Sequence, residues 1–455
     1  MLKRKAWEKL LEWKQNKEKK ALCIIGARQI GKTTLVREFG RSCYDHFVEI
    51  NFITDKRAHD IFSGALDADT LITNITAYVQ QPMEPGKTLV LLDEIQECPN
   101  ARTAIKFLVE DGRFDYIETG SLLGVKHKEV RSYPVGYEEI YRMYPLDFME
   151  YLWANGVQDA TIDYLFECYE GMKSVSTSVH DTLNKLFYSY IVVGGMPQVV
   201  QLYVESHDIG KVINAQKDIL ELYRLDIGKY AESSNKIKAK AIFDSIPSQL
   251  NNKNRRFILT KVDEHGRQNR YSNSFEWLSE AGVALACYNV TEPQAPLQLN
   301  EKHSLFKLFM SDTGLLCAAS MESIQFDILH GDVDINLGSI LENVMAQGIK
   351  SNGFNLHYYD SKRYGEVDFV IGRGMKVDLI EIKSGNDYKK HNALNSISRV
   401  QNWTFDRKIV FCKANVEHSE GIYYMPFYMI MFYENKHTVS DMKYEIDLSA
   451  LEGRK

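Results

Sequence analysis

Residues 26–33 of this chain are Gly-Ala-Arg-Gln-Ile-Gly-Lys-Thr and satisfy every fixed position of the pattern G-x-x-x-x-G-K-[ST]. An apolar run, 21–25, precedes the pattern, and a stretch with helical periodicity, 34–39, follows it. This order predicts a buried parallel strand, a phosphate-binding loop and a helix whose N-terminus faces the anion. The chain is therefore expected to contain an α/β nucleotide-binding domain.

Within this loop, Lys32 is expected to reach the β- and γ-phosphates of ATP, and Thr33 to ligate Mg²⁺. The strand and the helix around the pattern disfavour the alternative, a turn that matches by chance. The predicted nucleotide-binding residues of the loop are Gly26, Ala27, Arg28, Gln29, Ile30, Gly31, Lys32, Thr33 and Thr34.

A second apolar run, 88–92, ends in Asp93 and Glu94. In such a strand the aspartate holds Mg²⁺, and the following glutamate is placed to polarise the attacking water, which favours hydrolysis over binding alone. A further strand, 114–119, leads to Ser121, our first candidate for sensing the γ-phosphate, with Thr119 second. A turn or helix cap is an equally good interpretation of Ser121.

Composition narrows the class of protein. A chain of 455 residues holds two to four domains, and a net charge of -6 means that any nucleic-acid contact comes from a local patch. Seven scattered cysteines with no C-x-x-C pair argue against disulfides and structural zinc.

Neither a secretory signal nor an apolar run long enough for a bilayer is visible, so we expect a cytoplasmic protein without a membrane partner. Residues 1–20 have the pattern of an amphipathic helix that packs on the nucleotide-binding core.

The whole chain is expected to be a multidomain α/β protein. Helices and strands alternate in the first segment, as in a parallel sheet covered on both faces. The second is helical and resembles a lid, which usually directs a basic residue toward the nucleotide. Arg131, Arg142 and Arg224 are candidates, and for each of them a solvated surface side chain is the favoured alternative. The predicted boundaries are 1–145 for the ATPase core, 146–230 for the helical lid, 231–325 for a winged-helix-like domain and 326–455 for a nuclease-like α/β domain.

The third segment combines a predicted helix, 275–282, with two strands, 283–290 and 305–310. This is the winged-helix arrangement. Just before it lie basic residues that favour contact with the backbone of double-stranded DNA, the alternative being a solvated loop in a module for protein contacts. These residues are Arg255, Arg256, Lys261, Arg267 and Arg270.

The last segment contains predicted strands at 354–358, 366–371, 376–383 and 409–411. Asp368 lies on one strand, and Glu381 and Lys383 share a face of the next because strand side chains alternate. Asp368 and Glu381 are predicted metal ligands, Glu342 a further one, and Lys383 is placed to orient or deprotonate water. This is the D-(x)n-[DE]-x-K pattern of restriction-endonuclease-like enzymes. Cross-strand ion pairs are the alternative interpretation.

Taken together, the chain resembles a prokaryotic family of AAA-type ATPases that carry a C-terminal domain of unknown function with a PD-(D/E)xK nuclease-like fold. The resemblance rests on 26–34, 91–96, 119–121, 144–150, 193–197, 312–316, 342–343 and the group Glu366, Asp368, Glu381 and Lys383. It implies binding of ATP and Mg²⁺. Family members often have Gly-Arg where this chain has Gly136-Tyr137, so a sensor or finger arginine is missing or has moved.

Two hypotheses follow. In the first, Lys32 and Glu94 serve an Mg²⁺-dependent ATPase that controls a DNA-directed output, with Asp368, Glu381 and Lys383 cleaving nucleic acid. In the second, the chain is an ATP-dependent switch whose inactive nuclease-like domain is a scaffold for a protein partner or for self-association.

Overall fold

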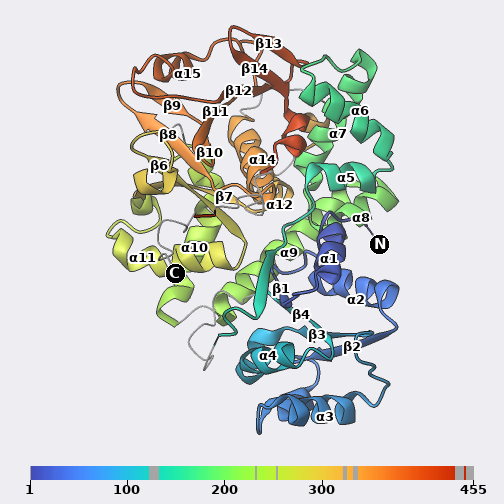
Figure 1. Cartoon of the computed structure of the whole chain (residues 1–455). Helices are drawn as coiled ribbons and strands as arrows, with labels where there is room; N and C mark the ends of the chain where they lie inside the picture. The colour runs from blue at the N-terminus through green and yellow to red at the C-terminus, as the bar shows by residue number, and fades with distance from the viewer. Residues whose placement is uncertain are drawn as a thin grey trace, which may run out of the picture.

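The computed structural model describes residues 2–121, 133–230, 233–252, 255–320, 325–330, 337–435 and 445–446. In this part of the chain, strands form one sheet in the N-terminal region and two sheets in the C-terminal half. Of the helices between residues 148 and 230, those before residue 207 lie along one side of the molecule, and the last runs through its middle (Figure 1).

The N-terminal sheet is parallel throughout, with strand order β2-β3-β4-β1-β5. Its strands β1 and β3 are apolar runs because helices bury a parallel sheet on both faces. The three strands predicted at 21–25, 88–92 and 114–119 are confirmed to within about a residue. The elements are β1 (Ala21–Ile25), α2 (Lys32–Cys43), β2 (His46–Asn51), η1 (Lys56–Phe62), α3 (Ala68–Val79), β3 (Thr88–Asp93), η2 (Ile95–Glu97), α4 (Pro99–Asp111), β4 (Asp115–Gly120) and β5 (Glu138–Arg142).

An N-terminal helix, α1 (Ala6–Gln15), covers part of this core. Leu10 and Trp13 are buried, and the ring of Trp7 meets Phe39 of α2 edge to face at 5.5 Å. The predicted amphipathic helix and its packing are confirmed.

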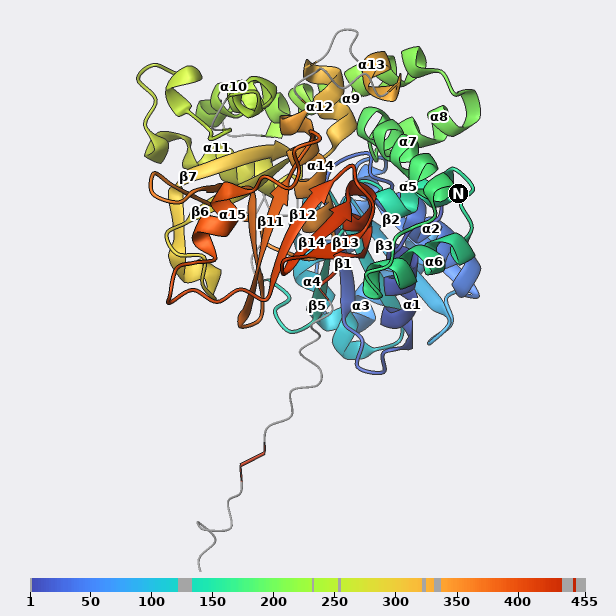
Figure 2. The same cartoon turned by 90° about the horizontal axis from the view of Figure 1, so that it is seen from above.

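The middle region is helical, as predicted, and bridges the two halves of the molecule (Figure 2). Phe187 of α7 stacks on Phe427 of the C-terminal turn η6, with ring centroids 5.9 Å apart. The helices are α5 (Phe148–Ala154), α6 (Asp159–Glu170), α7 (Thr177–Val193), α8 (Pro197–Ser206) and α9 (Ile209–Tyr230), and η6 is Phe427–Phe432.

The predicted hairpin is present: β6 (Ala284–Val290) and β7 (Glu301–Met310) are antiparallel. However, β6 also pairs with β8 (His357–Ser361), so the hairpin shares a sheet of order β7-β6-β8-β9 with residues beyond 325. The helices around it are α10 (Ser233–Leu250), η4 (Leu259–Lys261), α11 (Gln268–Glu280), η5 (Leu297–Asn300), α12 (Thr313–Ser320) and α13 (Gln325–His330).

The last sheet has the order β10-β11-β12-β14-β13, with antiparallel strands at both edges. The single strand predicted over 366–371 is wrong, since β9 pairs with β8 and β10 pairs with β11, and the chain changes sheets at Asp368. The strand predicted at 354–358 begins later, at His357. The elements are α14 (Gly338–Ser351), β9 (Gly365–Val367), β10 (Phe369–Arg373), β11 (Lys376–Ile382), α15 (Asn392–Ile397), β12 (Arg407–Cys412), β13 (Glu417–Ser419) and β14 (Ile422–Pro426).

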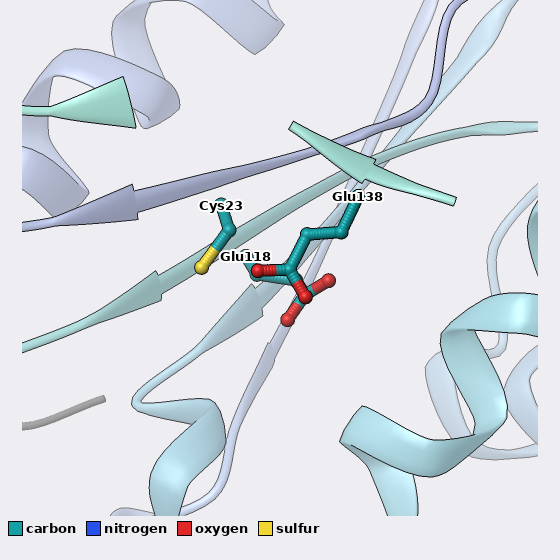
Figure 3. Close-up of side chains that lie close together, drawn as sticks. All are labelled: Cys23, Glu118 and Glu138. Carbon is teal, nitrogen blue, oxygen red and sulfur yellow. The ribbon is translucent and has the colours of Figure 1, made fainter. Parts of the chain in front are cut away.

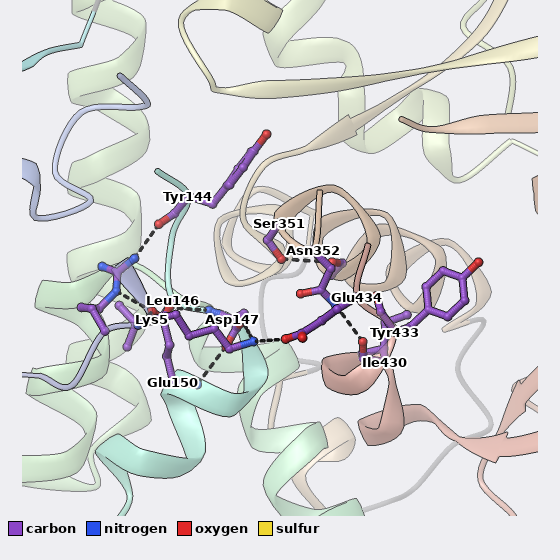
Figure 4. A network of polar contacts seen from close by, with 12 residues as sticks. Lys5, Tyr144, Leu146, Asp147, Glu150, Ser351, Asn352, Ile430, Tyr433 and Glu434 are labelled. Carbon is purple, nitrogen blue, oxygen red and sulfur yellow. Dashed lines mark hydrogen bonds and ion pairs between the residues drawn. The ribbon is translucent and has the colours of Figure 1, made fainter. Parts of the chain in front are cut away.

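A polar network links the segment before α1 to the segment after η6 (Figure 4). Lys5 Nζ lies 2.7 Å from Asp147 and 3.3 Å from Glu434. Asp147 also caps α5 in a capping box with Glu150. The motif 144–150 therefore has a structural role in joining the N-terminus, the helical region and the C-terminal turn.

A second set of polar contacts joins the segments 193–197 and 312–316. Asp312 is buried and accepts hydrogen bonds from the N–H groups of Gly195, at 2.6 Å, and Leu315, at 2.9 Å. Because a buried carboxylate needs such donors, this contact fixes α12 against the end of α7.

Candidate functional site

The phosphate-binding loop has the backbone that its glycines allow. Gly26 has φ +145°, and a Cβ at this position would lie 2.2 Å from the carbonyl oxygen of Met143. Met143 follows β5 and donates its N–H to Ile25 O at 2.8 Å. Any larger residue at position 26 would therefore push the loop away from the sheet.

Lys32 is the buried cation of the loop, with a residue exposure of 7%. Its Nζ donates to the carbonyl oxygens of Gly26, at 2.9 Å, and Ala27, at 2.7 Å. Burial lowers the pKa of Lys32 to about 8, although Glu94 and Asp93 oppose the shift. An ammonium that donates to backbone carbonyl oxygens in a buried loop is well suited to bind an anion.

The two predicted metal ligands of the ATPase core meet at the ends of α2 and β3. Thr33 Oγ1 donates to Asp93 Oδ1 at 2.8 Å, and Asn51 Nδ2 donates to the other carboxylate oxygen at 2.7 Å. The Thr119 hydroxyl also donates to Asp93. A hydroxyl and a carboxylate in contact form the oxygen donor set that Mg²⁺ prefers, so these residues fit the metal.

Glu94 follows Asp93 in a left-handed backbone conformation, with φ +55°. Gln96 Nε2 donates to Glu94 Oε2 at 2.5 Å and orients the carboxylate. A left-handed glutamate costs backbone energy, and such strain is concentrated at functional sites.

The other residues of the predicted loop lie as follows. Ala27 and Ile30 are buried, whereas Gln29 and Thr34 are exposed. Arg28 donates from Nε to Ser121 Oγ at 3.2 Å, which brings the loop and the γ-phosphate sensor candidate together.

Two residues of the site escaped sequence reasoning. Asn51 ends β2 beside Asp93, and only its position at the carboxyl end of a parallel strand could have indicated it. Arg4 is buried, donates to Ile30 O at 3.0 Å and pairs with Glu150 at 3.0 Å. No sequence signal marks Arg4, because its partners lie 26 and 146 positions away.

The three arginines considered for the nucleotide remain unranked. Arg224 pairs with Asp244 at 2.7 Å and also with Glu221, so carboxylates of α10 and α9 already neutralise its charge. Arg142 is exposed at the end of β5. Arg131 lies outside the described residues.

The C-terminal cluster is brought together in part. Phe369 pairs with Ile380, which sets Asp368, at the junction of β9 and β10, beside Glu381 of β11. Asp368 Oδ2 accepts the N–H of Ile382 at 2.8 Å, and Lys383 Nζ lies 2.5 Å from Glu381. Burial raises the pKa of Glu381, and the nearby Asp368 carboxylate raises it further.

Glu342 has cationic partners of its own. Lys307 of β7 is fully buried and lies 3.2 Å from Glu342 and 2.6 Å from Glu366, and Arg255 also pairs with Glu342. Lys307 Nζ also lies 4.9 Å from the ring centroid of Tyr358. These contacts match the alternative interpretation of the cluster as an ion-pair network.

Among the described residues, three potential metal-ligand atoms lie within 4.8 Å of one another at a different place, on Cys23, Glu118 and Glu138 (Figure 3). Arg102 already supplies a cation there, since its Nη2 lies 2.6 Å from Glu138 and its Nη1 lies 4.0 Å from Glu118. Burial, with Glu138 nearby, raises the pKa of Glu118 to about 8, so this carboxyl is mostly protonated at neutral pH.

The basic stretch proposed to face DNA is partly neutralised. Arg255 and Arg256 pair with Glu342 and Asp360, respectively, whereas Arg267 and Arg270 are exposed. Two of the four arginines of that proposed surface are therefore committed to contacts within the protein.

Comparison with known families agrees with this geometry. Residues 18–152 match the model of an AAA domain, residues 184–325 that of a domain of unknown function, DUF8612, and residues 337–430 that of another, DUF4143. Together with the parallel sheet and the loop, the first match makes the N-terminal region a P-loop domain of the AAA ATPase type. No curated protein matches the chain.

Solved structures of low similarity include a Walker-type ATPase of Pyrococcus abyssi, 13% identical, covering 70% of this chain and 96% of that one with a TM-score of 0.40. The Orc1 protein of Aeropyrum pernix in complex with DNA is 12% identical, with coverages of 72% and 91% and a TM-score of 0.30. Cdc6p of Pyrobaculum aerophilum is 12% identical, with coverages of 71% and 92% and a TM-score of 0.24. Scores this low say nothing further about the chain. In the described part of the chain, no helix has both the length and the apolar character needed to cross a membrane.

Proposed function

We propose that this chain binds ATP with Mg²⁺ and hydrolyses it. The observation that carries the proposal is the 2.8 Å contact between Thr33 and Asp93, made beside the buried Lys32. Lys32 holds the β- and γ-phosphates, and Thr33 and Asp93 hold the metal, which neutralises charge on the phosphates. Glu94, fixed by Gln96, orients the attacking water and accepts its proton.

The test is ATP binding and turnover by the full chain and by Lys32→Ala, with Lys17→Ala as an exposed lysine control. Loss of both activities in Lys32→Ala alone supports the proposal. Equal turnover by Lys32→Ala and the parent chain refutes the site.

For the output we propose that the nucleotide state acts as a switch on the C-terminal half, whose acidic cluster is an ion-pair network. The buried Lys307 between Glu342 and Glu366 favours this function, because an ammonium there neutralises Glu342, one of the three carboxylates that a catalytic metal would need. The partner of such a switch is a protein or a second copy of the chain.

Metal-dependent cleavage of DNA is the second candidate, and the juxtaposition of Asp368, Glu381 and Lys383 favours it. Its test is cleavage of a panel of DNA and RNA substrates with Mg²⁺ or Mn²⁺, with and without ATP, by the parent chain and by Lys383→Ala. Cleavage lost in the variant supports a nuclease. No cleavage under any condition leaves the switch as the output.

A further inference from the structure

The side chain of Arg28 links the phosphate-binding loop to helix α9. Its Nη1 lies 2.7 Å from Asp226 Oδ1, and its Nε donates to Ser121 Oγ at 3.2 Å. The Tyr223 hydroxyl, one turn earlier on α9, donates to the carbonyl oxygen of Arg28 at 3.1 Å. Both the backbone and the guanidinium of this loop residue are therefore held by the same helix.

The guanidinium lies beside Ser121, our candidate for sensing the γ-phosphate. Ser121 follows β4, and Thr119, two residues earlier, donates to the metal-binding Asp93. Arg28 belongs to the same loop as Lys32, and its side chain reaches from this loop to Ser121. Because an arginine pairs with phosphate oxygens at least as well as with a carboxylate, a γ-phosphate competes with Asp226 for Arg28.

Asp226 in turn depends on Arg28. Burial raises the pKa of Asp226, and the Arg28 charge opposes that shift. The side chain of Asp226 is 19% exposed, so without Arg28 this largely buried carboxylate loses its ion-pair partner, and only the more distant charge of Lys229 still favours its ionised form.

Helix α11 also lies close to the ion pair between Arg28 and Asp226. A small cavity of about 20 Å³ is lined by Arg28, Asp226 and Trp277 of α11, among others. Among the described residues, the buried Trp277 Nε1 has no hydrogen-bond partner. After α11, Gly282 adopts φ +73°, and a Cβ there would lie 2.9 Å from Ala27 N. Movement of Arg28 therefore acts on α9 and α11 together.

We infer that Arg28 is a γ-phosphate-binding residue that Asp226 holds in the nucleotide-free chain. A nucleoside triphosphate takes the place of the Asp226 carboxylate on the guanidinium and releases α9, whereas a diphosphate leaves the pair intact. This inference rests on the proposed ATP binding and adds the group through which the chain distinguishes ATP from ADP.

The test measures the equilibrium binding of β,γ-imido-ATP and of ADP, both with Mg²⁺, to the full chain and its variants. Calorimetry gives the affinities, and tryptophan emission is a second readout. In Asp226→Asn, affinity for the triphosphate analogue rises about fivefold, while affinity for ADP does not change. In Arg28→Met, affinity for the analogue falls about tenfold. Asp218→Asn, an exposed aspartate on the same helix, binds both nucleotides like the parent chain.

Tryptophan emission provides a readout that is independent of turnover. The analogue, but not ADP, changes the emission of the parent chain, and Trp277→Phe removes this change. An unaltered ratio of the two affinities in both Asp226→Asn and Arg28→Met overturns the inference while leaving ATP binding intact. Failure of the parent chain to bind either nucleotide overturns the proposed function itself.

Discussion

Replacing Lys307 with methionine removes a buried positive charge and keeps a side chain of similar length. Lys307 is 0% exposed and contacts Glu342, which is 1% exposed, and Glu366, which is 28% exposed. The substitution therefore removes one cation that neutralises both Glu366 of β9 and Glu342 of α14.

The size of the effect follows from these contacts. Removing one partner of a buried ion pair costs about 3–5 kcal/mol. Glu342 retains Arg255, and water reaches Glu366, so we expect the lower limit, about 3 kcal/mol. A loss of this size speeds hydrogen exchange through local opening by about 150-fold.

Hydrogen exchange followed by mass spectrometry measures this loss where it occurs. Amides of β7 and α14 should exchange about 150-fold faster in Lys307→Met, while those of β2 and β3 serve as an internal reference. Lys302→Met, an exposed lysine on the same strand, controls for the substitution. Unchanged exchange in β7 and α14 would refute the view that Lys307 neutralises the cluster.

Two further predictions concern the ATPase domain. Glu94→Gln should lower ATP turnover by about 100-fold or more without weakening ATP binding, because it removes only the proton acceptor; equal losses in a binding and a turnover assay would contradict this role. The pKa of Glu118 is about 8 in the folded chain and exceeds that of an unfolded glutamate. The contribution of this group to the free energy of unfolding is therefore fully present below about pH 4.3. It is lost as the pH rises to about 8, by up to about 1.4 kcal/mol per pH unit. Glu118→Gln should remove this part of the pH dependence of the melting temperature, with Glu12→Gln as an exposed control; an unchanged profile would show that Glu118 is ionised.

The proximity of the predicted nucleotide-binding residues could be anticipated because the sequence signal is local. A loop of eight residues and the end of one apolar strand specify Lys32, Thr33 and Asp93, and the order of strands in a parallel sheet then brings them together. The contact between Arg28 and Asp226 could not be predicted, because 198 positions separate the two residues and no periodic pattern relates them.

The C-terminal half shows a different limit of sequence reasoning. Residues 365–373 form one run of extended backbone apart from Asp368, and alternation of side chains cannot show that its two parts pair with different sheets. Likewise, the charges of Arg255 and Lys307 are visible in the sequence, but only the fold shows that both reach Glu342.

The sheet that joins the hairpin to the C-terminal half also limits how the protein can be divided. A fragment that begins at residue 326 would leave β8 with the edge that β6 covers, and Glu342 without Lys307. An exposed strand edge invites pairing with other chains, and an unmatched buried carboxylate weakens the fold. An independently stable C-terminal fragment should therefore begin before β6, close to Gly282, which packs against the nucleotide loop.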